Sequence, residues 1–174
     1  DTDSNNELSE VTEKIAFVTE ETTIACGSMK SANLPNANLV VQLTASAAYF
    51  FELSENGVEM LKNSQPLRFT DRVISAEVCD PYVLVKFQNR IALYQTSGDM
   101  NNPLKDVTAR MPDVMVNHCE TAHISQLQFK NTIYLTSVSG AKINDKKLRI
   151  IELTPTRENE VEKKDIIFET NIFA

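Results

Sequence analysis

Short runs of β-branched and aromatic residues, separated by tight turns, follow one another along the middle of the chain, which is typical of β-strands. Three such runs, rich in β-branched and aromatic residues, are Val73–Val78, Tyr82–Phe87 and Arg90–Gln95. The tight connections Asp80-Pro81 and Gln88-Asn89 lie between them. Connections this short join antiparallel neighbours, because a parallel crossover takes about a dozen residues or more. The pattern therefore predicts a β-meander.

The same pattern occurs on both sides of this meander. Upstream, four runs include a wide first gap, the loop Lys30 to Asn38, and a Glu55-Asn56-Gly57 turn. Downstream, four more runs include a looser hairpin from Ser139 to Lys147. The predicted strands are Thr23–Met29, Leu39–Thr44, Ala47–Leu53 and Val58–Leu61, and then Ala122–Phe129, Thr132–Val138, Leu148–Leu153 and Val161–Phe168.

These meanders recur at a period of about 50 residues, within the range of propeller blades. Superposing the first strands aligns Ile24, Ile74 and Ile124, and likewise Met29, Cys79 and Phe129. A sandwich or a simple barrel also has short strands, but its strands need not recur in sets of four. We predict an all-β fold, an incomplete β-propeller segment of three four-stranded antiparallel blades. Because the chain has no Trp, it is not expected to be a WD-repeat propeller.

Composition narrows the function classes. The chain has 174 residues, a formal net charge of −7 and 42% hydrophobic residues, which is ordinary for a globular protein. No apolar stretch approaches the ~20 residues of a membrane helix, so no membrane contact is expected. Nucleic-acid binding draws on Lys and Arg, so direct binding by this acidic chain is not expected. The odd count of three cysteines predicts reduced thiols.

Residues with catalytic or ligand chemistry are few. The group His118-Cys119-Glu120 with His123 lacks the paired spacing of a zinc site, and we interpret Cys26 and Cys79 as packed thiols within strands. No Gly-x-Ser-x-Gly elbow is present, so a propeller hydrolase is the weakest alternative. The stretch Cys26 to Lys30 has one glycine in a predicted strand and no phosphate loop. We therefore predict no catalytic residue, no metal, no cofactor, no small-molecule substrate and no enzyme activity.

Two further features have ordinary structural explanations. A basic cluster of Lys142, Lys146, Lys147 and Arg149 could contact RNA or an acidic partner, but Asp145 interrupts it and charged hairpin tips are usually just solvated. The adjacent residues Phe50 and Phe51 face opposite sides of one strand, so both faces of that blade are predicted to be covered. Neither feature identifies a partner-binding residue.

Several short sequences resemble the three-propeller proteins that include the large subunit of the cleavage and polyadenylation specificity factor. They are Leu8-Ser9-Glu10-Val11-Thr12-Glu13, Thr22-Thr23-Ile24-Ala25-Cys26-Gly27, Leu39-Val40-Val41-Gln42-Leu43 and Asp80-Pro81-Tyr82-Val83-Leu84-Val85. The family also includes the large damaged-DNA-binding subunit, an adaptor of cullin-type ubiquitin ligases, and a propeller subunit of a U2 splicing factor. These two are similar to the chain over Phe17–Leu43, and the Asp-Pro-Tyr-Val turn favours the polyadenylation subunit.

This resemblance implies a fragment of a larger nuclear protein that acts as a non-catalytic scaffold in pre-mRNA 3′-end processing. Its partners would be other protein subunits of a large complex, a WD-repeat subunit and a zinc-finger subunit, with RNA reached only through the complex. Residues 1–110 would be two blades ending one propeller, and residues 111–174 would be one blade that opens the next. The loop Lys30–Asn38 departs from the family pattern as an insertion.

Overall fold

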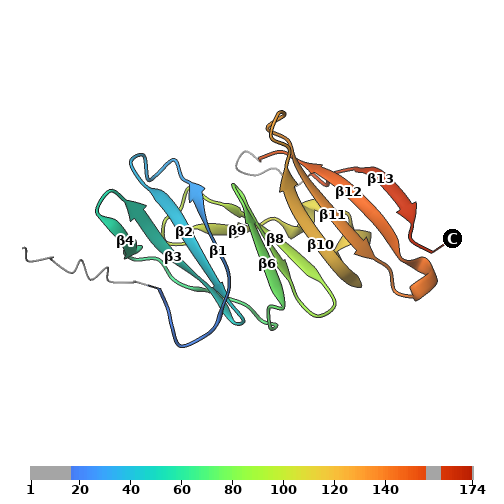
Figure 1. Ribbon diagram of the computed structural model, residues 1–174, viewed down its shortest axis with the longest axis horizontal. Helices are drawn as coiled ribbons and strands as arrows, with labels where there is room; N and C mark the ends of the chain where they lie inside the picture. The colour runs from blue at the N-terminus through green and yellow to red at the C-terminus, as the bar shows by residue number, and fades with distance from the viewer. Residues whose placement is uncertain (1–16, 156–161, 174) are drawn as a thin grey trace, which may run out of the picture.

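The computed structural model describes residues 17–155 and 162–173. Its strands form three antiparallel sheets that stack in a row along the long axis of the molecule (Figure 1). Each sheet is a meander in which consecutive strands are neighbours. The predicted all-β fold of three antiparallel blades is confirmed. None of the described helices is long and apolar enough to cross a membrane.

The first sheet has a split outer edge. Its strands are β1 (Thr23–Lys30), β2 (Asn38–Thr44), β3 (Ala47–Ser54), β4 (Gly57–Met60) and β5 (Leu67–Arg68). One end of β3 pairs with β4, through Phe51 opposite Met60, and the other end pairs with β5, through Ala47 opposite Arg68. The short strands β4 and β5 therefore share the fourth position of this sheet, each beside one end of β3. A loop joins β1 to β2 as the sequence pattern predicts, and its interpretation as an insertion stays a prediction.

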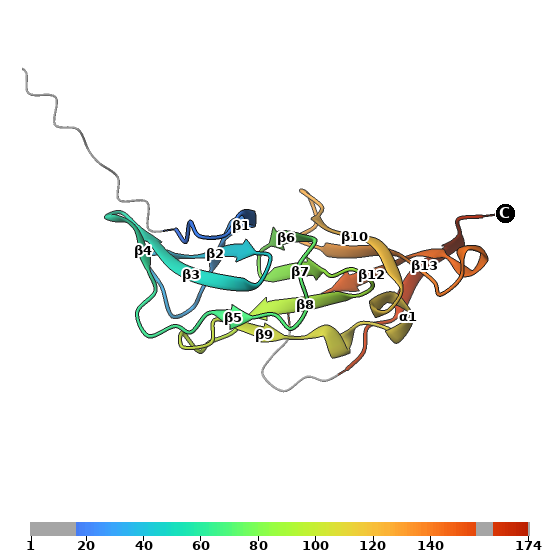
Figure 2. The ribbon, with the colours of Figure 1, turned by 90° about the horizontal axis from the view of Figure 1, so that it is seen from below.

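The second and third sheets each have four strands. The second contains β6 (Ser75–Cys79), β7 (Tyr82–Lys86), β8 (Ile91–Thr96) and β9 (Leu104–Asp106). The third contains β10 (Cys119–Gln126), β11 (Ile133–Ser139), β12 (Lys147–Leu153) and β13 (Ile166–Asn171). The short helices are η1 (Thr108–Arg110), α1 (Asp113–Val116) and η2 (Ile143–Asp145). The first strands β1, β6 and β10 lie along one long side of the molecule, opposite β5 and β9 (Figure 2).

The second sheet is buried on both faces. This explains why four consecutive residues of β7, Tyr82–Val85, are apolar or aromatic. Successive side chains of a strand point to opposite faces. Val83 and Val85 accordingly pack in a cluster shared with the first sheet, and Tyr82 and Leu84 pack in a second cluster shared with the third sheet. Each core thus lies between two sheets, and the middle sheet contributes to both.

The adjacent residues Phe50 and Phe51 confirm that the first sheet is covered on two faces. Phe50 belongs to the cluster between the first and second sheets. Phe51 is fully buried on the opposite face, where the ring of Phe17 meets it edge-to-face at a centroid distance of 5.0 Å. The segment that precedes β1 therefore covers the outer face of this sheet at Phe51.

Gly27 allows the first strands of two sheets to approach closely. A Cβ atom at this position would lie 2.7 Å from the Cβ and Cγ1 atoms of Val78 in β6. Real carbon atoms do not approach so closely without a shift of the backbone. The predicted role of Gly27, a small residue in a first strand, is therefore confirmed.

The predicted alignment of the first strands is wrong at two positions. Phe129 lies in the turn after β10 and is 96% exposed, whereas Met29 is 1% exposed in the core. Ile74 precedes β6 and is 57% exposed. The three first strands begin at Thr23, Ser75 and Cys119, so the distance between them is not constant and one fixed spacing cannot superpose all three. The predicted strands also did not include β9, because a strand of three residues is too short to show a pattern.

Other predictions lie partly or wholly outside the described residues. Leu8-Ser9-Glu10-Val11-Thr12-Glu13 falls there, and so does the Val161 start of the last predicted strand; within the described part, β13 begins at Ile166. The division at residue 110 stays a prediction. The third sheet packs directly on the second through Tyr82, Leu84 and Ile124 in the shared core.

Candidate interaction surface

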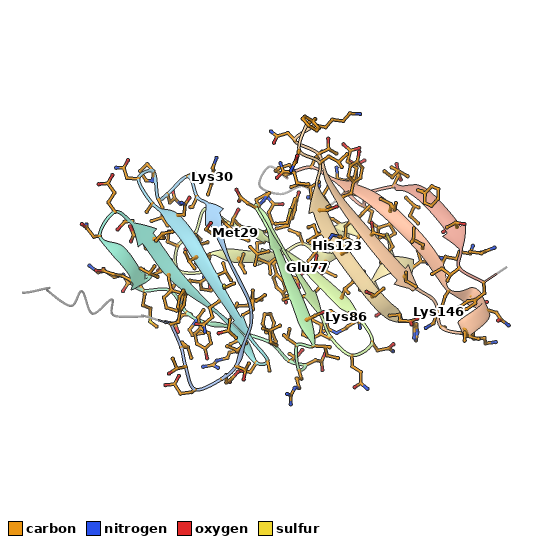
Figure 3. All side chains as sticks on the ribbon, in the orientation of Figure 1. Met29, Lys30, Glu77, Lys86, His123 and Lys146 are labelled. Atoms are coloured by element: carbon orange, nitrogen blue, oxygen red, sulfur yellow. The ribbon has the colours of Figure 1, made fainter. Side chains whose placement is uncertain are left out.

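The histidine and cysteine residues near β10 do not converge on one point. Cys119 is buried, and its thiol donates a hydrogen bond to the Thr121 carbonyl (3.3 Å). The ring of His118 lies 3.4 Å from the Asn89 amide, whereas His123 Nδ1 lies 2.9 Å from Glu77 (Figure 3). Among residues 17–155 and 162–173 there is no group of three His, Cys, Asp or Glu side chains arranged to hold a metal.

Glu77 connects the first strands of the second and third sheets. Both carboxylate oxygens lie 2.9 Å from His123 Nδ1, and one of them also accepts a hydrogen bond from the Ile124 backbone N–H at 2.8 Å. The His123 ring is largely exposed, so the contact forms at the surface rather than in a pocket. We interpret this arrangement as a link between sheets. It has no catalytic geometry.

The cysteines do not all pack as expected. Cys119 is buried and Cys79 is half-buried, and burial raises the pKa of both thiols. Cys26, in contrast, is exposed, so the interpretation of Cys26 as a packed thiol is wrong. The reason is that its strand β1 is a sheet edge whose side chains alternate between the shared core and solvent.

The basic cluster is largely neutralised by acidic neighbours. Lys146 pairs with Glu120. Lys147 and Arg149 both bind Glu169, with N–O distances of 3.0 and 2.7 Å. These pairs use charges that would otherwise attract RNA phosphates, which agrees with the solvated-hairpin interpretation.

Glu169 makes the stability of the third sheet sensitive to acid. Hydrogen bonds from Arg149 and Lys147 lower the pKa of Glu169 in the folded state. The unfolded chain therefore binds the proton more readily, and the stabilisation is present above the ordinary glutamate pKa and lost as the pH falls below it. We expect Glu169→Gln to show a smaller fall in melting temperature than the wild type between about pH 6 and pH 3.

Thermal denaturation followed by circular dichroism across this pH range would test the prediction. The control is Glu152→Gln, which changes an exposed carboxylate in the neighbouring strand β12. An acid response of Glu169→Gln equal to that of the control and the wild type would contradict the assignment.

A buried arginine is another feature that the sequence did not reveal. Arg110 is 3% exposed, and its two terminal nitrogens both donate to the Thr154 carbonyl at 3.2 Å. The Arg110 carbonyl accepts a hydrogen bond from the Lys164 backbone N–H. Arg110 thus fixes both ends of the connection between β12 and β13. We interpret its role as structural, because its contacts hold Thr154 and Lys164 in place.

The candidate binding site lies along one rim of the stack, where turns join β2 to β3 and β7 to β8. Two adjoining hollows of about 870 and 390 Å³ share Asp71, Arg72 and Ile74. Lys86, labelled in Figure 3, ends β7 at this rim. We call the two hollows together the rim groove. The lining residues used below are Glu21, Ser46, Phe69, Arg72, Ile74 and Arg90.

The floor of the rim groove is held rigidly by backbone hydrogen bonds. The N–H groups of Phe69, Val73 and Ile74 donate to the carbonyls of Ser46, Ala45 and Lys86 at 2.8–2.9 Å. The Phe69 ring also contacts the rings of Phe87 and Tyr94 edge-to-face, with centroid distances of 5.9 Å. The segment from Phe69 to Ile74 is therefore fixed at both ends.

Charges are distributed unevenly along the rim groove. Ser46 donates a 2.6 Å hydrogen bond to Glu21, and this bond lowers the pKa of Glu21, so the carboxylate stays ionised. Arg90 is paired with Asp71 at 2.8 Å. Arg72 is exposed, and within the described part of the chain no hydrogen bond or ion pair engages its guanidinium.

The sequence contains no motif at this site. Ile74 was predicted to lie in the strand Val73–Val78. Arg72 lies directly before that strand, and no function was predicted for it. The groove forms because the turn after β2, the segment before β6 and the turn after β7 meet at one rim, although they are far apart in sequence. No signal in the sequence distinguishes these residues, because the pairing of Arg72 depends on tertiary placement.

The stacked four-stranded meanders, with first strands along one side and cores between sheets, define a segment of a β-propeller protein. A family model described as the RSE1/DDB1/CPSF1 second beta-propeller matches residues 2–173. The chain belongs to this family, which confirms the resemblance at the level of the superfamily. No curated protein matches the chain. The family fits a scaffold or adaptor role in which the propeller binds other proteins.

Proposed function

We propose that this chain is part of a non-catalytic scaffold subunit of the nuclear complex that cleaves and polyadenylates pre-mRNA 3′ ends. Family membership supports a scaffold of this type, since it covers residues 2–173. The observation that carries the choice within the family is the Asp80-Pro81-Tyr82-Val83 sequence. It forms the tight turn between β6 and β7 and resembles the polyadenylation subunit.

The scaffold would hold protein partners, including a WD-repeat subunit and a zinc-finger subunit, and would reach RNA through them. The net charge of −7 supports this indirect route, because strong phosphate binding draws on uncompensated Lys and Arg. Three of the four basic-cluster residues are already paired with carboxylates. A hydrolase mechanism has no support in the positions of His118 and His123, which have different partners.

Affinity purification of the full-length protein that contains this chain, followed by mass spectrometry, tests the proposal. Recovery of cleavage and polyadenylation subunits is the expected result. Recovery of a cullin and ubiquitin-ligase components instead would assign the chain to the adaptor branch of the family. Recovery of U2 splicing components would assign it to the splicing branch. Either outcome would overturn the proposal.

A further inference from the structure

We propose that the rim groove binds an extended segment of a partner protein that presents an apolar side chain to Ile74 and a carboxylate to Arg72. This inference rests on the proposed function as a protein-binding scaffold and adds the chemistry of one contact. The larger hollow, of about 870 Å³, has the size of a site that takes a few side chains.

The apolar part of the site combines an exposed and an anchored side chain. Ile74 is 57% exposed at the point that the two hollows share. Phe69 lines the larger hollow from below and is held by its contacts with Phe87 and Tyr94. A fixed apolar floor gains affinity because little conformational entropy is lost when a partner side chain covers it.

The backbone of the groove floor suits an extended partner. Phe69 and Val73 are tied to the turn between β2 and β3, whereas the N–H groups of Thr70, Asp71 and Arg72 donate no hydrogen bond to any described residue. These three groups lie on exposed residues, so they are available to the carbonyls of a bound chain. Pairing of this kind favours an extended segment over a helix, whose carbonyls are mostly used internally.

The charges determine which segment fits and how it lies. Two arginines line the groove. Arg90 is paired with Asp71, whereas Arg72 has no acidic partner among the described residues. The ionised Glu21 carboxylate, which lines the larger hollow and not the smaller one, repels a second acid there. The partner carboxylate therefore belongs at Arg72, with the apolar side chain next to it. A basic segment would meet Arg72 unfavourably, and charge matching of this kind selects partners.

Site-specific photocrosslinking in the full-length protein tests this inference. Benzoyl-phenylalanine is placed at position 74, and a control places it at position 143, where Ile143 is 64% exposed on η2 of the third sheet. We expect position 74 to give crosslinked peptides that contain an apolar residue beside Asp or Glu, and position 143 not to give these peptides. No crosslink at position 74, or crosslinks to segments without a carboxylate, would overturn the proposal.

A synthetic peptide of the crosslinked segment then measures the charge contribution. Arg72→Glu is expected to weaken binding on the order of tenfold or more. Lys142→Glu makes the same charge change on an exposed residue of the third sheet and is expected to leave binding unchanged. Arg72→Lys keeps the charge and should retain most of the affinity. Equal binding by Arg72→Glu and the wild type would contradict the proposal, provided circular dichroism shows both folded.

Failure of this inference and failure of the proposed function give different results. If the full-length protein still recovers its complex but position 74 gives no crosslink, the scaffold role stands and the groove is not its contact. If purification recovers no polyadenylation subunits while position 74 crosslinks an apolar and acidic segment, the groove stands and the proposed complex is wrong.

Discussion

Replacing Met29 with alanine is expected to lower the free energy of unfolding by about 2–5 kcal/mol. Met29 is 1% exposed and packs in the cluster between the first and second sheets. Truncation removes apolar contacts and leaves a cavity that the two sheets cannot close, because both are fixed by their own strand pairing. Denaturant unfolding followed by circular dichroism would measure the change.

Phe129→Ala is the matched control, since the sequence period made Phe129 equivalent to Met29. The Phe129 side chain is 96% exposed in the turn between β10 and β11, so its removal is expected to change the free energy of unfolding by less than about 0.5 kcal/mol. If the two substitutions destabilised the protein equally, the observed end of β10 at Gln126 would be wrong.

Gly27→Ala is expected to cost about 1–3 kcal/mol of unfolding free energy, although it adds one methyl group. The new Cβ atom would lie 2.7 Å from Val78 Cβ, so β1 and β6 would have to separate. Ser28→Ala, at an exposed position of the same strand, is expected to have little effect. Thermal and denaturant unfolding of the two variants would provide the comparison.

A second substitution shows whether the contact is specific. Val78→Ala combined with Gly27→Ala is expected to restore only part of the lost stability, because the Cβ–Cβ contact remains after the γ carbons are removed. Full stability in Gly27→Ala alone would mean that the two strands do not approach as closely as described.

The meander architecture could be predicted from the sequence because it depends on local patterns. In runs such as Tyr82–Phe87 every residue except Lys86 is apolar or aromatic, and the turns beside them are too short for a crossover. The position of Phe129 could not be predicted in this way. A fixed period assumes equal distances between first strands, whereas β10 begins at Cys119 and its pairing with β11 ends at Gln126 opposite Ile133, three residues before Phe129.

The rim groove was beyond prediction for a different reason. Arg72 and Ile74 lie close in sequence, but Glu21 and Arg90 join them only because the first and second sheets stack on each other. The absence of a partner for Arg72 also depends on tertiary placement, since Asp71 next to it is used by Arg90. Sequence patterns describe strands and turns, and they do not show which charges remain unpaired after folding.

The contact of Glu77 with the Ile124 backbone has a consequence for solubility. β10 is the edge of its sheet, and an edge strand with free N–H groups can recruit strands from other molecules and aggregate. At Ile124 the N–H group is already bound by a carboxylate of the neighbouring sheet. Stacking of the second sheet on the third thus blocks intermolecular strand addition at this residue, and Glu77 protects the folded protein against misassembly there.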